Sequence, residues 1–199
     1  MLKVEDIKEA KERINGVVKR TPLEYSERLS KIYEAEIYLK REDLQCVRSY
    51  KIRGAYNLIS SLEKEKREKG IVCASAGNHA QGVALSCSTL KTKGVIYMPE
   101  QTPKQKVSKV RYFGGEFVEI RLIGRTFDEC SSEAVNFCEE NKMTYVPPFD
   151  DYKVMAGQGT VALEILEDLD DVDTCVVPIG GGGLVAGLST YFKEVSPST

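Results

Sequence analysis

The chain has 199 residues, of which 42% are hydrophobic and 29% charged, and its formal net charge is −2. This composition is typical of a globular protein of one or two domains. The basic residues are spread along the chain, which argues against a nucleic-acid partner. No apolar run approaches the ~18 residues of a membrane span, and acidic residues occupy the start of the chain, where a signal peptide is apolar. We therefore expect a cytoplasmic protein without a membrane partner.

The cysteines and the single histidine indicate neither disulfides nor a metal site. The six cysteines show no CxxC spacing and mostly fall inside apolar or helical patterns, so we expect reduced thiols in the core. Because His79 is the only histidine, a multi-histidine metal site is excluded.

The first expected element is an amphipathic helix near the amino terminus, because Val4, Ile7 and Ile14 fall on one helical face. From residue 70 onward, short β-branched runs alternate with helical periodicity, which is typical of parallel strands joined by crossover helices. The fold class is therefore α/β. We expect strands over residues 36–39, 71–74, 94–98, 116–120, 144–146 and 174–177, and helices over residues 52–62, 80–90, 103–112, 127–141, 160–169 and 184–192.

Capping signals support two of these helix starts. Thr102 is a good N-cap residue, and Pro103 after it suits the first helical position. Thr126 and Glu129 have the spacing of a capping box, in which each side chain bonds the other's backbone N–H.

Two glycine- or proline-rich stretches indicate how the chain is divided. The consecutive prolines in residues 147–151 end regular structure, so this turn is the best candidate for a crossover between two lobes. After Val177 the pattern restarts with a glycine-rich turn and one helix, and we expect a sheet of this kind to need further strands.

The first stretch with potential chemistry is centred on Lys51. This lysine falls at the start of an amphipathic helix, so we expect the aliphatic part of its side chain to lie toward the core. A lysine amine attacks an aldehyde only when partly deprotonated, a state that burial and the nearby cations Arg48 and Arg53 would favour. Taken alone, this motif fits a solvated surface lysine better than a nucleophile.

The second stretch, residues 74–82, lies between an expected strand and an expected helix. Its small residues let the backbone approach a ligand, and Ser75 with the N–H groups of the helix start could bind a carboxylate. Asn78 adds a side-chain amide. Taken alone, an ordinary strand-to-helix turn explains the stretch equally well.

The third stretch is a run of four glycines, Gly180 to Gly183, before Leu184. Free backbone N–H groups and the helix dipole at this position favour a phosphate, and a flexible turn is the alternative. A Walker A loop is excluded because no Gly-Lys-Ser/Thr follows. A dinucleotide fingerprint is met only loosely, by Gly181, Gly183 and Ala186.

In this order, the three stretches resemble the pyridoxal 5'-phosphate (PLP) enzymes of the tryptophan-synthase-like fold, and most closely the threonine dehydratase family. The resemblance runs over almost the whole chain, from Thr21-Pro22-Leu23 through residues 38–45 to the final glycines, and includes residues 157–160. Residues 46–51, Cys-Val-Arg-Ser-Tyr-Lys, look more like the biosynthetic branch than the catabolic one.

The resemblance implies a role for each stretch. Lys51 would hold PLP covalently and act in catalysis with Ser75, and Asn78 would hydrogen-bond the hydroxyl of the cofactor ring. The phosphate would be bound by Gly180, Gly181, Gly182, Gly183 and Leu184, and the substrate carboxylate by Ser75, Ala76, Gly77, Asn78 and His79.

The resemblance also implies a two-lobed fold with a parallel sheet, incomplete at the carboxyl end. Residues 1–50 and 148–199 would belong to the larger, PLP-binding lobe and residues 51–147 to the smaller one. Family members continue with further strands and, in the biosynthetic branch, a regulatory domain. We therefore expect weak PLP affinity and little dehydratase activity from the 199-residue chain, and a homo-oligomer for the full-length protein.

The implied reaction is that of a threonine ammonia-lyase, a lyase of branched-chain amino-acid biosynthesis. It converts L-threonine to 2-oxobutanoate and ammonia, the first step of isoleucine biosynthesis, and L-serine more poorly to pyruvate. Serine racemase and hydroxyaspartate dehydratase share the same loops and stay open as alternatives. A non-catalytic PLP-binding fragment that docks with a partner is a further alternative, from a different class.

Overall fold

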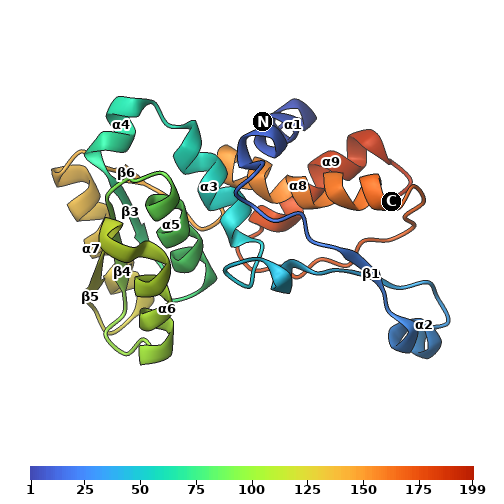
Figure 1. The fold of residues 1–199 in the computed structure, drawn as a ribbon, viewed down its shortest axis with the longest axis horizontal. Helices are drawn as coiled ribbons and strands as arrows, with labels where there is room; N and C mark the ends of the chain where they lie inside the picture. The colour runs from blue at the N-terminus through green and yellow to red at the C-terminus, as the bar shows by residue number, and fades with distance from the viewer.

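The computed structural model describes all 199 residues. Figure 1 shows two parts side by side: a parallel sheet with its covering helices, and a group of helices formed by α1 (Val4–Ile14), α8 (Tyr152–Asp168) and α9 (Gly183–Val195). The helix α3 (Lys51–Ser61) lies between the two parts, and α4 (Lys64–Lys69) leads from it into the sheet. None of the helices is both long enough and apolar enough to cross a membrane.

The sheet has four parallel strands in the order β5-β4-β3-β6. Alternate residues of its central strands face opposite layers: Ile71 and Cys73 pack under the helices on one face, and Val72 and Ala74 pack under α7 on the other. This arrangement confirms the predicted α/β class. The strands are β3 (Ile71–Ala74), β4 (Gly94–Met98), β5 (Val118–Leu122) and β6 (Thr144–Tyr145), and their helices are α5 (Asn78–Thr89), α6 (Lys104–Gly114) and α7 (Phe127–Glu140).

A small antiparallel hairpin protrudes from the helical part. It pairs β1 (Leu23–Tyr25) with β2 (Tyr38–Lys40), and α2 (Glu27–Tyr33) caps its far end (Figure 1). The sequence predicted only one strand here, over residues 36–39, and the observed strand lies slightly later. Three-residue strands carry too little periodicity to be recognised without their partner.

Three further predictions are wrong in detail. Residues 174–177 form no strand, because no neighbouring strand lies alongside to supply the ladder of hydrogen bonds. The helix expected from residue 160 begins at Tyr152, where the Asp151 carboxylate accepts hydrogen bonds from the N–H groups of Lys153 and Val154. The strand predicted over 116–120 begins at Val118, after a short 3₁₀ turn.

The two predicted caps have different outcomes. The Thr126–Glu129 capping box is confirmed, with the Glu129 N–H 3.2 Å from Thr126 Oγ1. At α6 the N-cap is Pro103 instead of Thr102, so the cap prediction is wrong by one residue. The hydroxyl of Thr102 is buried without a hydrogen-bond partner.

The helices α3 and α8 cross with their backbones in contact. A Cβ added at Gly157 would lie 2.4 Å from the carbonyl oxygen of Arg53, and one added at Gly54 would lie 2.8 Å from that of Val154. Only glycine permits this approach. The crossing therefore fixes the first turns of α3, which carry Lys51, against α8.

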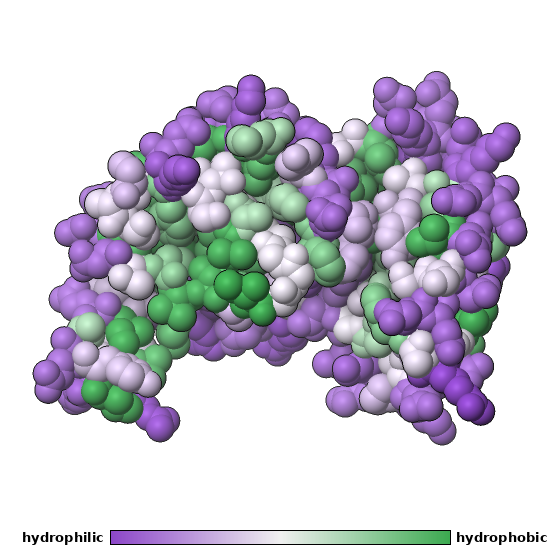
Figure 2. All heavy atoms as spheres, turned by 180° about the vertical axis from the view of Figure 1, so that it is seen from behind, coloured by the Kyte–Doolittle hydropathy of each residue, from purple (hydrophilic) through white to green (hydrophobic).

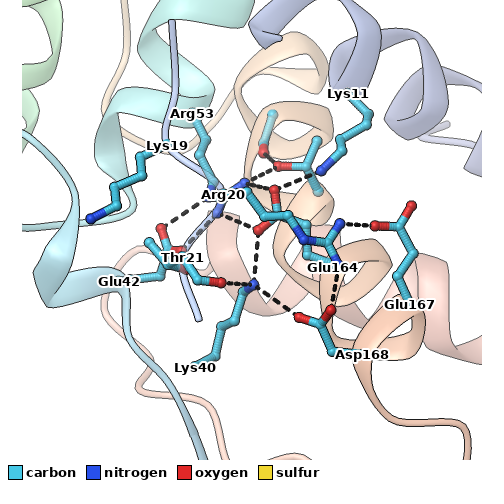
Figure 3. Close-up of polar contacts among 12 residues, drawn as sticks. Lys11, Lys19, Arg20, Thr21, Lys40, Glu42, Arg53, Glu164, Glu167 and Asp168 are labelled. Atoms are coloured by element: carbon cyan, nitrogen blue, oxygen red, sulfur yellow. Dashed lines mark hydrogen bonds and ion pairs between the residues drawn. The ribbon is translucent and has the colours of Figure 1, made fainter. Parts of the chain in front are cut away.

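A buried ion cluster accompanies this crossing (Figure 3). The guanidinium of Arg53, which is 0% exposed, pairs with Glu42 from the segment after β2 and with Glu164 from α8, at 2.7 and 2.8 Å. Glu164 also forms ion pairs with Lys11 of α1 and Lys40 of β2, both at 2.8 Å. Four segments that are distant in sequence are thus joined through one pair of carboxylates.

The pKa of Glu164 predicts how the stability of the protein changes at acidic pH. Burial alone would raise the pKa of this carboxyl, but the hydrogen bonds and charge of Arg53, together with Lys11 and Lys40, lower it from 4.5 to about 2. A carboxylate with a depressed folded-state pKa stabilises the fold fully above pH 4.5, and that stabilisation is lost as the pH falls toward 2.

We expect the free energy of unfolding, measured with urea at a series of pH values, to fall steeply across this window. The variant Glu164→Gln is expected to be less stable at neutral pH and to lose less stability on acidification. Equal pH slopes for the wild type and the variant would contradict this role of Glu164.

Exposed hydrophobic residues gather on one face of the part that holds α8 and α9. Figure 2 shows this area from behind the view of Figure 1. Val176 and Ile179, in the unpaired segment before α9, are 92% and 71% exposed.

Candidate active site

One four-residue segment brings the three predicted stretches together. This segment, residues 146–149, is called the strap below. Its Val146 carbonyl oxygen lies 2.9 Å from His79 Nε2, and its Pro148 carbonyl oxygen lies 2.6 Å from Lys51 Nζ. Its Phe149 packs against the glycine run, because a Cβ added at Gly183 would lie 2.9 Å from the Phe149 carbonyl oxygen.

The local sequence explains why the strap can serve in this way. Val146 is still tied to the sheet, since its N–H donates to the carbonyl of Val72 at 2.8 Å. Pro147 and Pro148 have no N–H groups and leave regular structure, so their carbonyls remain free to accept hydrogen bonds from side chains. The strap therefore leaves the sheet after β6 and runs to α8 with carbonyl oxygens that accept hydrogen bonds from the side chains of His79 and Lys51.

Lys51 is the first residue of α3 and is half-buried. Burial lowers the pKa of its amine below the ordinary value. A Cβ added at Gly82 would lie 3.2 Å from the Lys51 carbonyl, so α5 packs closely against the backbone of this residue. Lys51 is therefore held between the strap, α3 and α5, and is not a solvated surface lysine.

The expectation that Arg48 and Arg53 depress this pKa is wrong. Arg48 is exposed and donates to the carbonyl of Asp43, and the charge of Arg53 is compensated by the two carboxylates of the ion cluster. Burial is the cause that acts on Lys51.

The second stretch begins at the carboxyl end of β3, the edge at which parallel sheets bind ligands. Ser75 follows the strand, and its Oγ accepts the N–H of Gly77 at 3.3 Å. Asn78 is exposed and is the first residue of α5, whose initial N–H groups have no partner within the helix. Residues 75–79 thus provide a hydroxyl, an amide and a helix amino terminus at the start of α5, the helix that packs against Lys51 through Gly82.

His79 is buried and neutral. Burial, opposed by the hydrogen bond to Val146 and reinforced by the charge of Lys51, lowers the pKa of its imidazole to about 4. Because a carbonyl oxygen can only accept, Nε2 carries the proton and donates it to Val146. The other ring nitrogen, Nδ1, is buried without a partner.

The glycine run lies at the start of α9, as predicted. Gly182 is its N-cap residue with φ +86°, a conformation that suits glycine. A Cβ added at Gly180 or Gly182 would meet nothing within 4 Å, so open space adjoins the loop. Free N–H groups at a helix start beside open space form a site for an anion such as phosphate.

The residues present fit a phosphorylated aldehyde. The amine of Lys51 and the glycine run contact consecutive strap residues, Pro148 and Phe149 respectively. Two buried polar atoms near Lys51 have no partner: Nδ1 of His79, and Oγ of Ser49 two residues before the lysine. Unpaired buried polar groups are costly in a finished core and are common where a ligand binds.

The contact between Phe149 and Gly183 gives a matched pair of variants. In Gly183→Ala the new methyl group would meet the backbone of Phe149, whereas in Gly180→Ala it would enter open space. We expect Gly183→Ala to lower the free energy of unfolding by ~1–3 kcal/mol, and Gly180→Ala to change it by less than about 0.5 kcal/mol. Urea denaturation of both variants would measure the difference, and equal values would contradict the observed packing.

A family model described as "Pyridoxal-phosphate dependent enzyme" matches residues 14–199. The chain belongs to this family. Two curated members are similar over the whole chain: the biosynthetic L-threonine dehydratases IlvA of Halalkalibacterium halodurans, with 53% identity, and of Bacillus subtilis, with 52%. The chain covers 48% and 47% of these two proteins, so it spans about half the length of the curated relatives it matches.

Solved structures of this PLP family have the same fold. The processed form of threonine deaminase isoform 2 from Solanum lycopersicum matches with a TM-score of 0.92 and 44% identity, over 98% of this chain and 53% of that one. Maize serine racemase matches with a TM-score of 0.94 and 34% identity, over 99% of this chain and 59% of that one. These matches confirm the predicted fold family.

Sequence reasoning missed the strap. Its acceptors are backbone carbonyls, which carry no signature of their own, and Pro147-Pro148 was read only as a boundary. The signal that could have found it is the pair of prolines directly after a buried strand, since these residues free carbonyls at the edge where ligands bind.

Proposed function

We propose that the protein is a PLP-dependent threonine dehydratase. It would convert L-threonine to 2-oxobutanoate and ammonia, and L-serine more poorly to pyruvate, in the cytoplasm and as a step of isoleucine biosynthesis. The single observation that carries the proposal is the amine of the half-buried Lys51, which donates to the Pro148 carbonyl of the strap, while the next strap residue, Phe149, packs against the glycine run. The identity of 52–53% to relatives with this name supports the choice of substrate.

In this proposal each predicted site residue keeps its role. Lys51 is the covalent attachment point for PLP, Gly180 to Gly183 with Leu184 bind its phosphate through backbone N–H groups, and Asn78 bonds the ring hydroxyl. The substrate carboxylate binds to residues 75–79, where the helix start of α5 and the hydroxyl of Ser75 favour an anion. Residues 51–147 form the smaller lobe, and residues 1–50 and 148–199 belong to the larger one.

The bound cofactor supplies an electron sink that accepts the electrons released when the substrate loses its α proton. The chain supplies the base, because burial leaves Lys51 Nζ more readily deprotonated than a surface lysine. The two helix starts orient the anionic ends of the reactants, and the buried surroundings exclude water. Loss of the β-hydroxyl as water, followed by hydrolysis, gives the ketoacid and ammonia.

The test is a ketoacid assay with PLP on the whole protein that contains residues 1–199, with Lys51→Ala as the control. Threonine-dependent formation of 2-oxobutanoate that requires Lys51 would support the proposal. Absence of any Lys51-dependent product from threonine, serine or hydroxyaspartate would overturn it.

Serine racemisation is the second candidate, because the fold is as similar to maize serine racemase as to threonine deaminase. Both reactions need a base at the α carbon, so the same lysine would serve. Incubation with L-serine separates them: a dehydratase yields pyruvate, whereas a racemase yields D-serine. D-serine as the main product would favour the second candidate.

The exposure of Val176 and Ile179, at 92% and 71%, favours an additional role in association. An unpaired, β-branched segment can accept a neighbouring strand from a partner. Sedimentation of the chain tests this: concentration-dependent association would support it, and a monomer at all concentrations would contradict it.

A further inference from the structure

The side chain of His79 is buried and hydrogen-bonded to the strap. Its ring is 3% exposed, and Nε2 donates to the Val146 carbonyl across 67 positions of sequence. This hydrogen bond is the only one the ring makes, since Nδ1 has no partner. His79 therefore joins the start of α5 to the strap.

The strap has few other attachments. Its first N–H, from Val146, bonds the sheet, and the carbonyl of Phe149 accepts the N–H of Asp151 at 3.1 Å. Between these points Pro147 and Pro148 contribute no donors. The backbone there is held by two side chains, His79 at Val146 and Lys51 at Pro148.

The two side chains act on carbonyls only two residues apart. A change at Val146 would therefore shift or loosen the carbonyl of Pro148, to which the Lys51 amine is bonded. It would also shift Phe149, which packs against Gly183 in the phosphate loop. The position of the strap is therefore expected to influence the separation between Lys51 Nζ and the glycine run.

We propose that His79 is a positioning residue for Lys51, which holds the strap through Nε2 so that the Pro148 carbonyl keeps the amine beside the glycine run. Its relevance to catalysis rests on the proposed function, but its effect on the strap does not. The side chain acts through a fixed tautomer, in which the proton stays on Nε2. The inference gives His79 a task distinct from the binding of a substrate carboxylate.

The test compares two amide variants with different reach. The side-chain NH₂ of glutamine in His79→Gln can take the position of Nε2 and donate to Val146, whereas the shorter asparagine in His79→Asn cannot. Both keep a polar group, so general effects of polarity are matched. Hydrogen exchange of the backbone amides of Val146, Phe149, Asp150 and Asp151, without PLP, then reports on the strap, and the amides of β4 report on the fold.

We expect His79→Asn to speed exchange in the strap by about tenfold, the factor that corresponds to the ~1.4 kcal/mol typical of a lost hydrogen bond. His79→Gln is expected to stay within about threefold of the wild type, and β4 to keep its protection in both. Equal strap exchange in the two variants would overturn the inference.

A second readout connects the strap to Lys51. The rate at which PLP and borohydride label Lys51 is expected to fall by about tenfold in His79→Asn and to be restored in His79→Gln. Wild-type labelling in a variant with a loosened strap would contradict the positioning role. If Lys51 is not labelled even in the wild type, the proposed function fails, while the exchange experiment still decides whether His79 holds the strap.

Discussion

Replacing Lys51 by alanine is expected to abolish the absorbance band that forms when PLP is added to the protein, together with all turnover. The reason is that the amine is the group that would react with the aldehyde, and the Lys51 amine bonds the strap at Pro148, next to Phe149, which packs against the glycine run. The measurement is an absorbance titration with PLP before and after borohydride reduction.

The matched control is Lys64→Ala, which removes an exposed lysine on α4. This variant should retain the band at wild-type intensity. A band of equal intensity in Lys51→Ala would show that PLP reacts elsewhere and would contradict the assignment of Lys51.

The variant Arg53→Met is expected to lower the free energy of unfolding by ~3–5 kcal/mol. Removal of this fully buried guanidinium leaves Glu42 and Glu164 without their shared partner, and a buried carboxylate without compensation is costly. The remaining cations, Lys11 and Lys40, pair with Glu164 and offset part of the loss. Urea denaturation at neutral pH measures the effect.

An exposed ion pair provides the control for Arg53. Lys31 and Glu27 lie 2.7 Å apart on α2 with side chains 75% and 74% exposed. Lys31→Ala should cost less than ~0.5 kcal/mol because water screens this pair. If Arg53→Met were as mild as Lys31→Ala, the ion cluster would contribute little to the fold.

The elements that the sequence predicted well are those with a complete local pattern. The strands β3 and β4 begin and end where predicted, because each is a run of buried apolar residues bounded by a turn. The helix α7 begins as predicted at its capping box. In these cases the signal lies within a few neighbouring residues.

The elements that were missed depend on distant partners. Residues 174–177 have the composition of a strand but no neighbour to pair with. The glycines at the α3–α8 crossing look like helix breakers in α8, and this explains why its predicted start was eight residues late. The sequence indicated Arg53 only as a cation near Lys51, because nothing in the local pattern identifies Glu42 and Glu164 as its partners.

The candidate site likewise has parts that the sequence predicted and parts that depend on distant partners. The motifs at Lys51, at residues 75–79 and at the glycine run could be read directly, and the order of all three indicated the family. That all three contact the strap could not be predicted, because the strap binds His79 and Lys51 through backbone carbonyl oxygens, which every residue has. Burial of Lys51, which favours its deprotonated form, is likewise a property of the folded chain.

The most direct test is to identify the residue that PLP labels. The wild-type protein would be treated with PLP and borohydride and then digested, and the pyridoxyl group located by mass spectrometry. The account predicts that Lys51 carries the label, with inorganic phosphate competing because it occupies the glycine run. Label distributed over exposed lysines such as Lys64 and Lys66, with Lys51 unmodified, would contradict it.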